Sequence, residues 1–164
     1  MSVDIETIKI AIISSRFNQD ISLRLQTRTI EHLCSQGVAI ENIKKIWVPG
    51  AFELPLAAAK CASSHTFAAI ICLGCVIKGD TPHFDWICQA TSRGIMDVSL
   101  KYLTPVVFGV LTTLSYEQAL QRCSGTNVVR QEKSLKKPAS DKSFEFAQSA
   151  LDMINIMKDQ NLGQ

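Results

Sequence analysis

Four short, almost uniformly apolar stretches alternate with longer stretches of helical periodicity along the chain. Runs without regular polar positions are typical of strands that are buried on both faces of a parallel sheet. Such strands are predicted at residues 8–13, 43–48, 67–77 and 105–112. We therefore predict an α/β fold, in which helices cover both faces of a four-stranded parallel sheet.

The intervening stretches carry the spacing and the end signals of helices. They predict helices at 20–36, 54–62 and 82–102. Gly37 should close the first helix, and Ser115-x-x-Gln118 is a capping box that should open a fourth helix. A C-terminal helix is predicted to bury one apolar face, made of Phe144, Ala147, Ala150, Leu151, Ile154 and Met157. Residues 124–140 are polar without any period, which predicts a surface loop.

Composition narrows the class of protein. A chain of 164 residues, 46% of them hydrophobic, suits one folded domain spanning 1–164. A net charge of +2 is too small to indicate binding to nucleic acid or to a membrane surface. No apolar run approaches the roughly 20 residues that a bilayer span needs. The start, MSVDIETIKI, is acidic and lacks a signal-peptide core, so we expect a cytoplasmic protein.

The six cysteines are best interpreted as reduced, small hydrophobic residues. Cys72 and Cys75 have the CxxC spacing of zinc and redox sites. However, they lie in a predicted strand, whereas a redox pair needs its first thiol at a helix N-terminus. No second CxxC or histidine pair completes a zinc site.

Ligands of a parallel α/β sheet bind at the carboxyl ends of its strands. The informative segments are therefore those that follow the strands: SSRFN (14–18), PGAFE (49–53), KGDTPH (78–83) and TTLS (112–115).

The segment after the third strand has the features of an anion site. Gly79 permits a sharp turn or a close backbone approach, and Thr81 followed by Pro82 is a good helix start with Thr81 as the N-cap. A phosphate should bind there. His83 falls in the first turn, where the helix dipole favours the neutral imidazole, a plausible proton shuttle. The alternative is an ordinary helix start with a surface histidine.

The other segments are ambiguous residue by residue. Phe17 is either a platform for a flat heterocycle or a loop residue packed on the core. Glu53 could accept hydrogen bonds from a ligand, or simply complement a helix N-terminus. Phe108 lies in a predicted buried strand, where core packing is the default, and Arg122 is by itself an ordinary last-turn cation. Two further histidines are expected to have only surface and loop positions, His32 and His65.

Four segments together carry a family resemblance: SRFN (15–18), VPGAFELPLAAA (48–59), GCVIKGDTPHFDWI (74–87) and PVVFGVLTTLSYEQALQR (105–122). In this order and spacing, across nearly the whole chain, they resemble the 6,7-dimethyl-8-ribityllumazine synthases of riboflavin biosynthesis. The resemblance implies a flavodoxin-like three-layer α/β/α sandwich. It also implies condensation of 5-amino-6-(D-ribitylamino)uracil with 3,4-dihydroxy-2-butanone 4-phosphate, releasing phosphate and water, without a metal or an organic cofactor.

The resemblance also implies roles for individual residues. It makes Phe17 the stacking platform for the pyrimidine and His83 the proton-transfer residue. It assigns the ribityl side of the substrate to Ala51, Phe52 and Glu53. It assigns the ring edge, through backbone groups, to Cys75, Val76 and Ile77. It assigns the phosphate to Gly79, Asp80 and Thr81. A neighbouring subunit would complete the pocket with Phe108 and a second phosphate ligand, Arg122.

The assembly implied is a homo-oligomer with sites at subunit interfaces. The segment after Arg122 is longer than in shell-forming members, and Asp141-Lys142-Ser143 occupies the start of the last helix. We therefore expect a pentamer or paired pentamers instead of a shell, and the role of Lys142 stays open. Riboflavin synthase is a candidate partner.

Two other classes of protein remain as alternatives. A non-catalytic flavin or lumazine binder could use the same pocket, although it would not need His83 and Arg122. A phosphate-receiving signalling domain on the same sheet would need an acidic cluster after the first strand, where this chain has Ser14-Ser15-Arg16.

Overall fold

Four parallel strands form the central layer of the structure, a computed structural model that describes residues 5–124 and 141–159. The strands are β1 (Ile10–Ser15), β2 (Ile43–Val48), β3 (Ala69–Ile77) and β4 (Val106–Thr113). All four predicted strands are thus confirmed, with shifts of two residues or fewer at their ends. Their order in the sheet is β2-β1-β3-β4, and every pairing is parallel.

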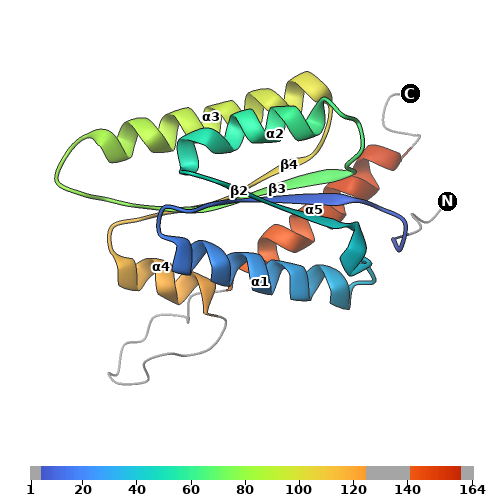
Figure 1. Ribbon diagram of the computed structural model, residues 1–164, viewed down its shortest axis with the longest axis horizontal. Coiled ribbons are helices and arrows are strands. Elements are labelled where there is room, and N and C mark those ends of the chain that lie inside the picture. Colours follow the sequence, from blue (N-terminus) through green and yellow to red (C-terminus); the bar gives the residue numbers. More distant parts are fainter. Residues whose placement is uncertain (1–4, 125–140, 160–164) are drawn as a thin grey trace.

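Helices cover both faces of this sheet, as Figure 1 shows. One face carries α1 (Gln19–Ser35), α4 (Tyr116–Cys123) and α5 (Lys142–Lys158). The other carries α2 (Leu54–Ala62) and α3 (His83–Tyr102). Two short 3-10 turns precede β2 and α2, namely η1 (Ile40–Asn42) and η2 (Ala51–Glu53). This is the three-layer α/β/α sandwich of the flavodoxin-like type.

The sheet separates two hydrophobic cores. Ile10 and Ile12 of β1 pack with α1, α4 and α5, whereas Ala11 and Ile13 pack with α2 and α3. Successive side chains of a strand point to opposite faces, so a strand covered on both faces must be apolar at every position. This explains the uninterrupted apolar runs in the sequence.

β3 extends beyond its partner β1. Residues 10–14 of β1 pair with 69–73 of β3, whereas residues 70–77 of β3 pair with 106–113 of β4. The last four residues of β3, 74–77, therefore have β4 on one side and no strand on the other. The chain leaves β1 toward β2 and returns across the sheet to β3, so this gap lies at the topological switch point of the fold.

The predicted helix ends are confirmed in part. Gly37 closes α1 with a φ of 100° and donates to the Cys34 carbonyl at 3.0 Å. The hydroxyl of Ser115 caps α4 by accepting from the Gln118 amide at 3.3 Å. The Gln118 side chain does not return to Ser115, however. It accepts from the Leu114 amide at 2.9 Å, one residue earlier than a capping box requires.

The predicted apolar face of α5 is wrong at both ends. Its centre is buried as expected, but Phe144 is 53% exposed and Met157 is 48% exposed. Ser143 is fully buried instead, beneath Thr29 of α1. Asp141 caps α5 by accepting from the Ser143 amide at 3.0 Å, and this cap turns the small Ser143 toward α1. Phe144 then lies at the edge of the interface between the two helices, against the His32 ring. Apart from Ser124, the predicted loop 124–140 lies outside the described residues.

The cysteines are free thiols, and four of them are buried. Cys72 and Cys75 lie in β3, and burial raises the pKa of Cys75 to about 12 and that of Cys72 still further. Because the reactive form is the thiolate, this pair is chemically inert at neutral pH. Within residues 5–124 and 141–159, no cluster of His, Cys, Asp or Glu side chains could hold a metal ion. No helix in the same part of the chain is long and apolar enough to cross a membrane.

Gly109 of β4 tests the packing of the sheet. An added Cβ would lie 2.6 Å from a Leu73 methyl and 2.7 Å from the Cys72 carbonyl oxygen, so strand backbone would have to move. We expect Gly109→Ala to lower the free energy of unfolding by about 1–3 kcal/mol, the usual cost of overpacking, in urea denaturation.

Gly79→Ala is the matched control, because an added Cβ there meets nothing within 4 Å. It should leave the free energy of unfolding nearly unchanged. Equal stability of the two variants would contradict this description of the sheet.

Candidate active site

The segments predicted to carry function meet at one edge of the molecule. In Figure 1, α1, α3 and α4 all begin at the same end of the sheet, beside the carboxyl ends of the strands. The Phe17 loop follows β1, η2 follows β2, and residues 78–82 lead from β3 into α3. The prediction that these segments share one edge is confirmed.

Phe17 is an exposed aromatic ring on a loop that is held by its backbone. The Arg16 amide donates to the Val48 carbonyl at 2.8 Å, and the Phe17 amide donates to the Pro49 carbonyl at 3.1 Å. The Phe17 residue is nevertheless 72% exposed. It is therefore not packed on the core, and the geometry leaves its ring free to stack on a flat ligand.

Asn18 joins this loop to β3. Its backbone is left-handed, with φ of 55°, a conformation that asparagine adopts more readily than most residues. It stands at the N-cap position of α1, yet its side chain does not cap the helix. Instead, Nδ2 donates to the Cys75 carbonyl at 2.9 Å. The sequence pattern gave Asn18 no role, because an asparagine before a helix indicates only a cap.

The open end of β3 faces the Phe17 loop. Backbone groups of successive strand residues point to opposite sides. The Lys78 amide donates to the Thr113 carbonyl of β4, and the Cys75 carbonyl accepts from Asn18 on the other side. Cys75 and Ile77 therefore direct their backbone groups into the gap beside β1, whereas Val76 directs its groups toward β4. Cys75 and Ile77 are the better placed for backbone contacts to a ligand.

The η2 turn supplies a fixed carboxylate. Oε2 of the half-buried Glu53 accepts from the Gly50 amide at 2.9 Å, which confirms that Glu53 complements the start of a helical turn. The Thr91 hydroxyl of α3 donates to the Ala51 carbonyl at 3.2 Å and holds the turn in place. Phe52 is exposed. The second oxygen of Glu53 makes no hydrogen bond to any described residue, so it can accept one from a ligand.

The predicted capping by Thr81 is wrong. α3 begins at His83 with Pro82 as its N-cap, and the Pro82 carbonyl accepts from the Asp85 amide at 3.0 Å. The φ of −64° at Pro82 already starts the helical turn, which leaves Thr81 one residue too early to cap it. No side chain among the described residues caps this helix. Its first amides remain available to an anion.

The surroundings of this helix start are open to solvent. Gly79, Asp80, Thr81 and His83 are all exposed. Gly79 does not have a positive φ, so the turn does not require glycine, and no atom lies within 4 Å of an added Cβ. Neither the backbone conformation nor the packing of the described residues requires a glycine here.

Phe108 and Arg122 lie away from this edge in their own chain. Phe108 pairs with Cys72 of β3 and lies five residues, or about 17 Å, before the end of β4. It is 39% exposed, so the expected core packing is wrong. Arg122 lies in the last turn of α4, about 9 Å along the helix from Tyr116, and Nη1 donates to the Gln118 carbonyl at 3.1 Å. One chain therefore does not bring these two residues to the Phe17 loop.

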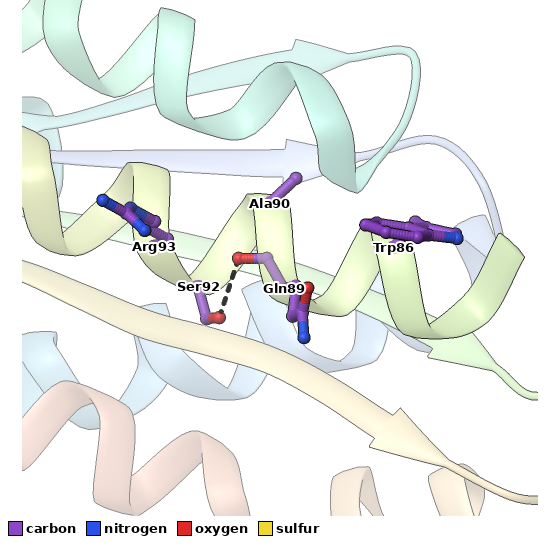
Figure 2. A pocket seen from close by; sticks show the side chains of 5 residues that line it. All are labelled: Trp86, Gln89, Ala90, Ser92 and Arg93. Carbon is purple, nitrogen blue, oxygen red and sulfur yellow. Dashed lines mark hydrogen bonds between the residues drawn. The ribbon is translucent and has the colours of Figure 1, made fainter. Parts of the chain in front are cut away.

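A hollow of about 610 Å³ lies on the outer side of α3. Its lining residues all come from this one helix, as Figure 2 shows: Trp86, Gln89, Ala90, Ser92 and Arg93. A hollow with a single wall is a surface trough and not an enclosed ligand pocket. None of the site residues predicted from the sequence lines it.

Comparison with known protein families agrees with the site. The family model described as 6,7-dimethyl-8-ribityllumazine synthase matches residues 7–158, which is nearly all of the 164-residue chain. The match spans every strand and α-helix of the described residues, together with every predicted site residue. The chain therefore belongs to the 6,7-dimethyl-8-ribityllumazine synthases, a family of transferases in riboflavin biosynthesis.

Proposed function

We propose that this protein condenses 5-amino-6-(D-ribitylamino)uracil with 3,4-dihydroxy-2-butanone 4-phosphate to form 6,7-dimethyl-8-ribityllumazine, phosphate and water. The observation that carries the proposal is the meeting of three features at one edge. They are an exposed aromatic ring, an open strand end and an uncapped helix start. The aromatic ring and the strand end suit a flat heterocycle, and the helix start suits a phosphate ester. The two substrates react with each other, so these features must be adjacent.

The pyrimidine would bind between the Phe17 loop and the open end of β3. Stacking on an exposed aromatic ring is favourable, and the backbone groups of Cys75 and Ile77 can pair with the polar edge of the ring. η2 adjoins this site, so Glu53 would accept hydrogen bonds from the ribityl hydroxyls, next to Ala51 and Phe52. Val76 would contribute through its side chain.

The phosphate ester would bind at the start of α3. Backbone amides of Gly79, Asp80 and Thr81 and the first amides of the helix would donate to its oxygens. The Asp80 carboxylate must then point away from the phosphate, because like charges repel.

His83 would move protons as phosphate leaves and the new ring closes. It is the first residue of α3 and is exposed at the same edge. Both substrates arrive as separate molecules, so much of the rate should come from holding them together, with a smaller contribution from proton transfer.

A second copy of the chain would complete the site. Phe108 and Arg122 are displaced from the carboxyl edge of their own chain, as residues would be that serve a neighbouring subunit. Exposed apolar side chains on and beside α2 and α3 favour oligomerisation: Leu56, Trp86, Met96, Leu100 and Leu103. We propose a pentamer or a pair of pentamers, working in the cytosol, where its six free cysteines would stay reduced. Riboflavin synthase as a partner stays a prediction.

His83→Ala tests the proton-transfer role. Incubation of the unsubstituted protein with both substrates should yield a fluorescent lumazine, which a non-catalytic binder would not produce. The variant should lose up to about 10²-fold in kcat and keep measurable turnover, because positioning of the substrates remains. His65→Asn, at an exposed loop residue with φ of 51°, is the control and should be fully active. Unchanged kcat in His83→Ala would rule out the role.

Gly79→Ala tests the phosphate site separately from the fold. A methyl group in the open space beside Gly79 should block the approach of phosphate, since hydrogen bonds to a charged group contribute strongly to binding. We expect the KM of the butanone phosphate to rise by about 10-fold or more, with the KM of the pyrimidine unchanged. An unaltered KM of the phosphate ester would place the phosphate elsewhere.

Native mass spectrometry tests the assembly. We expect a particle of five or ten chain masses, since a lone chain leaves its α2 and α3 surface unpartnered. A monomer would remove Phe108 and Arg122 from the site, and a megadalton particle would show that a shell forms after all.

A further inference from the structure

A hydrogen bond between two exposed side chains joins α4 to α1 near the Phe17 loop. The hydroxyl of Tyr116, the first residue of α4, donates to Oδ2 of Asp20 in the first turn of α1. Asp20 is exposed and Tyr116 is 42% exposed. Such a bond to an ionised carboxylate is stronger than one between neutral groups. The same bond raises the pKa of the Tyr116 phenol above its ordinary value.

The packing of α4 does not depend on this bond. Ala119 and Cys123 are fully buried against the core, and Ser115 caps the helix. A hydrogen bond between exposed groups adds little to stability. The bond links the start of α4 to the first turn of α1, beside the Phe17 loop.

That first turn is continuous with the Phe17 loop. Asp20 follows Phe17 by three residues, and the exposed ring has few neighbours to orient it. The loop is tied to β2 through the amides of Arg16 and Phe17, and to β3 through Asn18. The bond from Tyr116 adds a tie on the side of α4. Together these contacts hold the loop from three neighbouring elements.

We propose that Tyr116 is a positioning residue for the pyrimidine: its hydroxyl, bound to Asp20, holds the first turn of α1 and thereby the orientation of the Phe17 ring. This inference rests on the proposed function, because it assigns the pyrimidine to Phe17. It assigns no contact between Tyr116 and the substrate. The phosphate site at the start of α3 is a separate element and should not respond to Tyr116.

Tyr116→Phe removes the hydroxyl and keeps the ring. We expect the KM of the pyrimidine substrate to rise by about 2- to 10-fold, the scale of one lost hydrogen bond, with kcat and the KM of the butanone phosphate unchanged. The affinity for the lumazine product, measured by lumazine fluorescence, should fall by the same factor as the KM of the pyrimidine rises.

Substitutions of Asp20 provide the matched controls. Asp20→Asn keeps an oxygen that accepts from Tyr116 but loses the charge, so its KM for the pyrimidine should lie between those of the unsubstituted protein and Tyr116→Phe. Asp20→Ala should behave like Tyr116→Phe. The double variant Tyr116→Phe/Asp20→Ala should be no worse than the poorer single variant, because both remove one interaction.

Three results would overturn the inference. They are an unchanged KM of the pyrimidine in Tyr116→Phe, a parallel loss for both substrates, and additive losses in the double variant. If the unsubstituted protein binds lumazine without turnover, the proposed catalysis fails, while the affinity comparison still decides the role of Tyr116. If it binds no lumazine, both proposals fail.

Discussion

The open end of β3 is the feature on which the site depends. The pairing of β1 with β3 ends at Ser14 and Leu73, so backbone groups of Cys75 and Ile77 face a gap at the switch point of the sheet. A polar backbone group that loses water without gaining a partner costs about 1–3 kcal/mol. Asn18 satisfies the Cys75 carbonyl from the protein itself. The other backbone groups of Cys75 and Ile77 point toward the same gap, and the exposed ring of Phe17 lies on the loop that borders it.

The starts of several helices give this edge of the sheet a positive electrostatic potential. α1, α3 and α4 all begin there, so the positive ends of several helix dipoles meet beside the gap (Figure 1). Ser115 caps α4 and Asp141 caps α5, whereas no side chain among the described residues caps α1 or α3. The first amides of α3, the helix that follows the longest strand, are therefore open to an anion. This arrangement fits a reaction that joins a flat heterocycle to a phosphate ester.

The sequence predicted the layers of the fold well, because strands covered on both faces must be apolar throughout. Periodicity also placed Phe17, Glu53 and His83 after strands, and the parallel sheet brought them to one edge. Features that depend on neighbours were missed. Which face of α5 is buried depends on whether Ser143 or Phe144 fits beneath Thr29. Where α3 begins depends on the backbone conformation of Pro82. Asn18 was overlooked because its partner, the Cys75 carbonyl, is 57 residues away.

The decisive measurement is a crystal structure of the protein with inorganic phosphate and the lumazine product. We expect phosphate bound to the backbone amides of 79–81 and the start of α3, with the His83 imidazole facing it. The heterocycle should stack on Phe17, with its polar edge on Cys75 and Ile77. Phosphate bound elsewhere, with the imidazole turned away from the gap beside β1, would contradict the account.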